Sequence, residues 1–379
     1  MDMNEDILKK ERMEEIDKKI EKEKKRNKLK KKLKWFILAG VIFILAGGAS
    51  AYLLLTEKED ERREFPDIEI PVARLTIVDE DSNARPIAVM LDNNVGNAAH
   101  AGLQESIVNY EIIVEGGMTR IMAVFKDKDV SLIGPVRSAR HYFLDYAAQS
   151  DALYVHFGWS PISQSDISSL NVNNVNGLYD DQAFWRDNTI PSPHNVFTNT
   201  STIYQFVRDH RNFPVETENW RMLNWSAEEV VFPGAKFDDE TGELVLEDPR
   251  IQVNSVRIQY SPGQVRSYTF DFERGVYLRY MNNAPHVDKV TRETLHFKNV
   301  IIERVANASI DNEGRQGLTT VGAGTGYFIT NGFAMPITWE RESRTGRTTY
   351  RYLDGSIVWV NDGNTFVQVV PMNASVLFE

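Results

Sequence analysis

The sequence predicts an α+β protein built from an N-terminal transmembrane helix, a mixed α/β sheet domain and a β-rich C-terminal domain. Residues 35–55 carry no charge, and these 21 residues match the ~20 that a helix needs to cross a bilayer. Between residues 72 and 222, strand patterns mix with helix patterns, which is typical of helices packed on a sheet. From 223 to 379, short strand patterns separated by Gly turns indicate a nearly all-β domain.

The charge of the chain is strongly asymmetric along its length. The net charge is −11 over 379 residues, but residues 1–34 carry +5 and residues 56–379 carry −16. An acidic main body lacks the basic footprint that nucleic-acid binding needs. The chain has no cysteine, which excludes disulfides, thiolate metal sites and a cysteine-linked lipid.

The N-terminal segments predict a membrane anchor. Residues 1–34 read as a solvated helix or disordered tail, with a weak coiled-coil helix as the alternative. The lysine-rich end of this segment should stay in the cytoplasm, so residues 56–379 are expected outside, connected through a charged linker at 56–71. The alternative is a signal peptide cleaved after Ala51, but the long N-terminal region and the apolar run 52–55 favour an uncleaved anchor.

The mixed domain, residues 72–222, contains four strand patterns and four helix patterns. Gly116 and Gly117 predict a hairpin between its second and third strands, and Asn199 or Thr200 is suited to cap its last helix. The predicted strands are 86–93, 109–115, 119–126 and 152–157, and the predicted helices are 103–108, 137–149, 162–170 and 203–211.

The β-rich domain, residues 223–379, is expected to be a sandwich or a partly closed barrel. Its predicted strands are 256–260, 268–272, 276–280, 295–305, 326–330, 334–340, 348–352, 357–360 and 366–370.

The segment Gly134–Arg140 is the first candidate for a ligand site. A Gly-Pro turn is predicted to lead into a helix that opens on Arg137 and Arg140, with Ser138 at its mouth. Free N–H groups at a helix start, together with two guanidinium groups, suit a phosphate or carboxylate. The remaining residues expected to line the same cleft are Arg120, Glu115, His194 and Asn195. The structural alternative is that the arginines brace the domain by pairing with Glu111, Glu115 or Asp145.

Only a few residues are candidates for catalysis. Glu115 precedes two glycines that allow close approach of a ligand, Arg120 is placed to orient it, and Asp92 at a strand end is the obvious second group. A salt-bridged hairpin turn is the alternative for Glu115. Of the seven histidines, His194 is the best placed to be exposed in a site.

No other motif adds a known chemistry. His156 lies in an apolar strand and is more often a satisfied core residue, and His286 is a weaker exposed candidate. No zinc-binding pair, nucleophile elbow, phosphate loop or dinucleotide motif occurs, so we expect neither a metal nor a cofactor.

Several segments together resemble the YerB-like family of bacterial lipoproteins. They are EGGMTRIMAVF (115–125), IGPVRSARHYFLDYA (133–147), YVHFG (154–158), AFWRDNTIPSPHNVF (183–197), GTGYFITNG and WVNDGNTFVQVVP. The resemblance covers nearly all of 72–379 and implies two domains of unknown function on the outer face of the membrane. Family members often carry a lipobox cysteine, and this chain has none, so the transmembrane segment 35–55 would replace the lipid.

The sequence therefore favours a membrane-anchored, extracytoplasmic envelope protein that binds an anionic cell-wall ligand or a protein partner without catalysis. The alternative is a hydrolase or transferase on wall glycan or peptide, with Glu115 as acid or base. The position of Glu115 separates the two hypotheses. An open cleft shared with Asp92 or His194 would favour the enzyme, and burial against Arg137 or Arg140 would favour binding or plain structure.

Overall fold

The computed structural model describes residues 73–234, 236–237 and 244–379. Residues 72–379 form one compact unit with its own hydrophobic cores. The charged segment 1–34, the expected anchor 35–55 and the linker 56–71 lie outside the described residues. Within the described part of the chain, no helix is long and apolar enough to cross a membrane.

A large mixed sheet of eleven strands dominates the described structure. Its order is β11 (Ile251–Gln252), β21 (Phe333–Arg341), β20 (Gly322–Thr330), β17 (Asn299–Val305), β24 (Thr365–Pro371), β2 (Val108–Ile113), β3 (Thr119–Phe125), β1 (Ile87–Asp92), β4 (Leu153–His156) and β5 (Asn174–Asn176), with β22 (Thr349–Tyr352) paired to β21.

A second sheet of six strands comes entirely from the C-terminal part. Its order is β15 (Ala284–Pro285), β14 (Val276–Met281), β13 (Gln264–Asp271), β12 (Ser255–Ser261) and β25 (Ser375–Phe378), with β16 (His296–Phe297) paired to β14. Short two-stranded pairs complete the described strands: β6 (Trp185–Arg186) with β7 (Val196–Phe197), β8 (Trp225–Ser226) with β23 (Val360–Asn361), β9 (Lys236–Phe237) with β10 (Leu244–Leu246), and β18 (Asn307–Ser309) with β19 (Gln316–Leu318).

The described helices are short and all lie in the N-terminal half of the unit. They are α2 (His141–Ala148), α3 (Pro161–Ser169) and α4 (Thr200–Phe206), which continues as a π-helical turn, Val207–Arg211. Asn199 caps α4 by accepting a hydrogen bond from Thr202 N, as predicted. The expected helix at 103–108 is instead a turn that leads into β2. The fold is thus mostly β with few helices, a mixed sheet and a β-rich C-terminal part.

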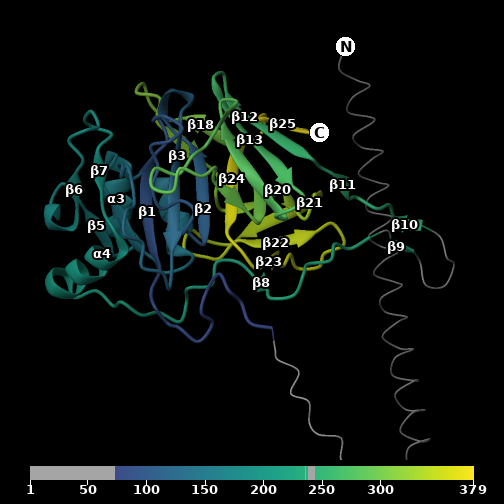
Figure 1. Ribbon diagram of the computed structural model, residues 1–379, viewed down its shortest axis with the longest axis horizontal. Coiled ribbons are helices and arrows are strands. Elements are labelled where there is room, and N and C mark those ends of the chain that lie inside the picture. Colours follow the sequence, from purple (N-terminus) through teal and green to yellow (C-terminus); the bar gives the residue numbers. More distant parts are fainter. Residues whose placement is uncertain (1–72, 235, 238–243) are drawn as a thin grey trace, which may run out of the picture. The chain divides into compact units, whose positions relative to one another are not determined.

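The large sheet joins the two halves of the sequence. β24 lies parallel to β2 on one side and parallel to β17 on the other, and Figure 1 shows yellow β24 beside blue β2. The predicted boundary at 222/223 therefore separates two stretches of chain that share one sheet.

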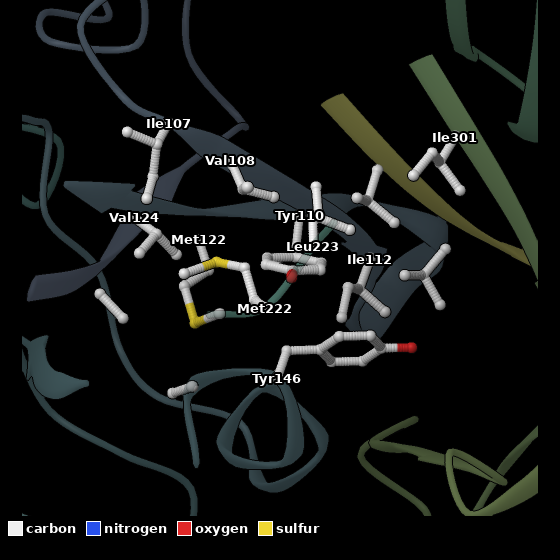
Figure 2. Packing of buried hydrophobic residues seen from close by; sticks show 14 of the residues in the cluster. Ile107, Val108, Tyr110, Ile112, Met122, Val124, Tyr146, Met222, Leu223 and Ile301 are labelled. Carbon is white, nitrogen blue, oxygen red and sulfur yellow. The ribbon is translucent and has the colours of Figure 1, made fainter. Parts of the chain in front are cut away.

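The two faces of this sheet bury different cores because side chains alternate along each strand. Ala88 and Met90 of β1 belong to the core that contains α2, whereas Val89 and Leu91 belong to the core shared with the second sheet. Figure 2 shows Tyr146 of α2 reaching toward β2, where its ring centroid lies 4.9 Å from that of Tyr110. The second sheet covers the opposite face as in a sandwich.

One edge of the large sheet collects several strand ends. β1, β4 and β5 run parallel, and β2 runs in the same direction because both β1 and β2 are antiparallel to β3. Their carboxyl ends therefore lie along one edge, which is where open α/β sheets usually hold their ligands.

Candidate functional site

The backbone of residues 137–139 is inserted between the ends of β1 and β4. Arg137 N donates to Met90 O of β1 (2.8 Å), and Phe157 N, just after β4, donates to Arg137 O (3.0 Å). Ala139 N donates to Gly158 O (2.9 Å). These bonds hold the segment in an extended conformation.

The predicted helix start at Arg137 is therefore wrong. Helix α2 begins at His141, and its N-cap residue Arg140 is extended (φ −129°, ψ 145°) without a side-chain capping bond. The free N–H groups of the helix start do not coincide with Arg137, so the anion seat cannot be built as predicted. Arginines at positions 137 and 140 still suit an anion, but the edge of the large sheet positions Arg137 instead of the start of a helix.

Gly134 brings a second loop to the same place. A Cβ at this position would lie 2.5 Å from Phe197 Cδ1 and 2.8 Å from Val196 O, at a φ of +157°. Val136 N then donates to Val196 O (2.7 Å). This close approach places His194, two residues before Val196, next to the Arg137 segment.

We call the charged residues gathered here the edge cluster: Asp92, Glu115, Arg120, Arg137, Arg140 and His194. Asp92 is buried at the end of β1, and its Oδ2 accepts a hydrogen bond from His194 Nδ1 (2.6 Å). Arg137 Nε lies 2.8 Å from the same oxygen but is not aligned as a hydrogen-bond donor. The side chains of Arg137 and His194 keep 25% and 29% of their surface exposed, which makes them the accessible rim of the cluster.

Glu115 forms the second pair of the edge cluster. It lies in the 3₁₀ turn Glu115–Gly117 between β2 and β3, and both carboxylate oxygens accept hydrogen bonds from Arg140 (2.6 and 3.0 Å). Burial alone would raise the pKa of Glu115, but the hydrogen bond and charge of Arg140 outweigh it and lower that pKa. Glu115 and Asp92 are thus each held by a different arginine.

Among the described residues, no carboxylate forms an ion pair with Arg120, although the charges of Glu115 and Asp92 act on it. Arg120 pairs with Asp92 across the β1–β3 ladder, and its guanidinium donates to the carbonyl oxygen of Ser138 (2.5 Å). Burial, followed by the charge of Arg140, lowers the pKa of Arg120 to about 10. A buried cation without an anionic partner is costly.

The remaining predicted site residues lie close by but serve the backbone or other side chains. Ser138 contributes its carbonyl oxygen to Arg120. Asn195 is buried, and its Oδ1 accepts from Arg186 Nη1 (2.7 Å). Among the described residues, no hydrogen bond joins the side chain of Ser138 or Asn195 to Arg137 or Arg140. Asp145, another carboxylate considered for these arginines, pairs with Arg344 (2.8 Å).

A second charged group, which we call the buried cluster, was missed by sequence reasoning. Its centre is Glu111 of β2, which is fully buried. The two arginines of the second sheet that bind it are Arg266 (2.6 Å) and Arg279 (2.5 Å). The other donors to its carboxylate are Thr119 (2.7 Å), Asn93 (2.8 Å) and Gln368 (3.1 Å). Burial would raise the pKa of Glu111, but the two arginines lower it to about 2.

A line of buried histidines connects the two clusters. The carbonyl oxygen of Asp92 can only accept, so His100 Nε2 donates to it (2.5 Å). His100 Nδ1 then accepts from His286 Nε2 (2.9 Å), whose Nδ1 accepts from Arg279. Burial lowers the pKa of His100 to about 4 and that of His286 well below its ordinary value, so both rings are neutral.

Two further histidines, His156 and His286, are buried. His286 was considered an exposed candidate, and this is wrong because it is fully buried. His156 is a satisfied core histidine, with ring nitrogens bonded to Gly158 O (2.8 Å) and Asn174 Oδ1 (3.2 Å). Among the described residues, no group of three or more acidic, histidine or cysteine side chains is arranged to hold a metal ion.

Comparisons with known proteins agree with the resemblance. Residues 74–213 match the family "Protein of unknown function (DUF3048) N-terminal domain", and residues 256–367 match the DUF3048 C-terminal domain. The chain is 25% identical over 358 residues to "Putative lipoprotein YerB" of Bacillus subtilis (strain 168), covering 89% of this chain and 96% of that protein. A crystal structure of YerB from Bacillus subtilis superposes with a TM-score of 0.66 at 25% identity, over 78% of this chain and 94% of that one.

Proposed function

This chain belongs to the YerB-like family defined by the DUF3048 N- and C-terminal domains, and from that premise we propose that it binds an anionic group of a cell-wall polymer at the edge cluster. Binding takes place outside the cell, with the domain held at the membrane by residues 35–55. Two features support this location: the uncharged 21-residue run itself and the naming of a relative as a lipoprotein.

The observation that carries the proposal is the uncompensated charge of the edge cluster. Its three guanidinium groups face two carboxylates, which leaves one positive charge before His194 is counted. Arg120 is the cation of this cluster that forms no ion pair with a described carboxylate, and burial and the neighbouring charge of Arg140 lower its pKa. A bound phosphate or carboxylate would supply the missing negative charge.

The cluster is also open to a ligand. Asp92 occupies Nδ1 of His194, so Nε2 is the ring nitrogen left for a ligand, and no described residue bonds to it. Arg137 is partly exposed and its Nε lacks an aligned acceptor. Residues 56–379 carry a net charge of −16, so a positively charged rim differs from the rest of this part of the chain.

A hydrolase remains the second candidate, with changed roles. The lowered pKa of Glu115 makes it a poor general acid near neutral pH, because it stays ionised. Asp92 bound to Nδ1 of His194 is the arrangement that orients a histidine base. His194 is therefore the base that this alternative requires.

Co-sedimentation with purified Bacillus subtilis cell wall tests the proposal on residues 72–379, the compact unit. Arg137→Ala should raise the apparent Kd for the wall at low salt about tenfold, as expected for one lost charge-assisted contact worth ~1.4 kcal/mol. Arg250→Ala removes the same charge from an exposed position and is the matched control. Treating the wall with hydrofluoric acid removes phosphate-linked polymers and so separates phosphate from carboxylate ligands.

Equal sedimentation of the wild type and the Arg137 variant would overturn the binding proposal. Release of soluble wall fragments that is lost in His194→Gln would establish the hydrolase instead.

A further inference from the structure

Exposed apolar side chains gather on the loops after β4 and β5, directly beside the edge cluster. Leu178 is 54% exposed and Tyr179 is 68% exposed. The ring of Trp159 lies 5.7 Å from that of Tyr179, with the two planes tilted by 43°. We call Trp159, Leu178 and Tyr179 the aromatic platform. Contiguous apolar surface with a polar rim marks a binding site more often than scattered exposed residues do.

The platform is held firmly although its upper surface is open. Asn176 Oδ1, at the end of β5, accepts from Gly158 N (2.9 Å) and from Leu178 N (3.1 Å). Asp180 Oδ2 accepts from Asn176 N (2.9 Å), and Tyr179 N donates to Asn176 O (2.9 Å). Below it, the buried ring of His156 lies 5.6 Å from that of Trp159. An ordered loop loses little entropy when a ligand binds.

Gly158 connects the platform to the edge cluster. A Cβ at this position would lie 3.6 Å from Leu178 Cδ1 and 3.7 Å from Ser138 Oγ, so the two side chains approach each other across the glycine. The backbone bonds of Gly158 and its neighbour Phe157 to residues 137–139 fix this spacing. The apolar platform and the cationic rim therefore border one another.

From this juxtaposition we propose that the ligand is an acidic saccharide, which rests on the proposed function and specifies its ligand class. A pyranose ring has a C–H face that packs on an aromatic ring and a hydroxyl rim that stays hydrated. The sugar would lie on the platform, and its carboxylate or phosphate would reach Arg137. A protein partner fits less well, because a stable protein interface needs ~800 Å² on each side, far more than three side chains supply.

Titration calorimetry on residues 72–379 tests this proposal with three probes: the N-acetylglucosamine–N-acetylmuramic acid disaccharide, its neutral counterpart diacetylchitobiose, and inorganic phosphate. The acidic disaccharide should bind more tightly than either other probe. Tyr179→Ala should weaken it about tenfold, Tyr179→Phe should retain it, and neither variant should change phosphate binding. Arg137→Ala should weaken both the acidic disaccharide and phosphate.

Phe272→Ala is the matched control, because Phe272 is also 68% exposed but lies in the β13–β14 hairpin. If Tyr179→Ala binds the disaccharide as well as Phe272→Ala does, the proposal that a saccharide lies on the aromatic platform is refuted. This holds even if Arg137→Ala weakens binding as expected. If Arg137→Ala also binds normally, the proposed function fails as well. Capture of an envelope protein that depends on Tyr179, without disaccharide binding, would overturn the saccharide proposal too.

Discussion

The buried cluster and the edge cluster use the same chemistry to different ends. Each contains arginines and carboxylates brought together by the large sheet, but Glu111 receives five donors and has no exposed surface. In the edge cluster, Arg120 forms no ion pair with a described carboxylate, and Arg137 and His194 remain partly exposed. A carboxylate enclosed by donors, such as Glu111, serves the fold, whereas a charged cluster that stays accessible is suited to bind a ligand.

The buried cluster also joins the two halves of the chain. Glu111 comes from β2 in the first half, and Arg266 and Arg279 come from the second sheet. Burying these charges is tolerable only while every partner is present, since an unpaired buried charge is strongly destabilising. The buried cluster therefore makes the packing of the second sheet depend on the first half.

The largest expected effect comes from Glu111→Gln. The amide keeps the shape but leaves two buried guanidinium groups without a counter-charge, and the expected loss is about 3–5 kcal/mol in the free energy of unfolding. Glu115→Gln in the edge cluster should cost less than about 1 kcal/mol, because that pair is partly solvated. Urea denaturation of both variants measures the difference. Equal losses would show that the two clusters do not differ as described.

Acid should lower the free energy of unfolding, because the buried histidines are held neutral in the folded protein. Burial lowers the pKa of His100 and that of His156 to about 4, and it lowers the pKa of His286 well below its ordinary value. The unfolded chain binds protons below pH 6.5 while the folded chain does not, so stability is complete above 6.5 and falls as the pH drops toward 4. The expected loss is about 2 kcal/mol each for His100 and His156 between pH 7 and pH 5.

The lowered pKa of Glu115 gives stability that is lost only as the pH falls below about 4.5, its ordinary value. Urea denaturation of the wild type and of His156→Gln at pH 7 and pH 5 measures the contribution of one histidine, and the substitution should reduce the dependence of the free energy of unfolding on pH by about one proton. A free energy of unfolding that does not change between these two pH values would contradict the neutral, buried assignment.

Local patterns predicted many elements of the first half. β1 follows from the apolar run before Asp92, and the β2–β3 hairpin follows from Gly116 and Gly117, which have φ values of +67° and +71°. The capping of α4 by Asn199 is also a local signal. These elements depend on neighbours in sequence, so their physics is visible in the sequence.

The missed features depend on residues far apart in the chain. The extended conformation of residues 137–139 comes from hydrogen bonds to β1 and to Gly158, and no local helix signal could show it. Glu111 lies 155 and 168 residues before its two arginines, so no spacing indicates the buried cluster. In the sequence, the buried cluster shows only as one charged residue, Glu111, within an apolar strand. The residues of the edge cluster were chosen because they lie in distinctive segments of the sequence, and the sequence does not show that the sheet brings these segments to one edge.

The smallest expected effect is also the one that best separates binding from catalysis. Glu115→Gln removes one negative charge and releases Arg140 from its bidentate partner. The edge cluster then gains one positive charge, and wall binding at low salt should become several-fold tighter, with the gain shrinking as added salt screens the charges. Glu273→Gln, in the exposed β13–β14 turn, removes the same charge elsewhere and should change nothing. A hydrolase that used His194 as its base would instead release soluble wall fragments from Glu115→Gln as from the wild type, because Asp92 and His194 are unchanged in this variant.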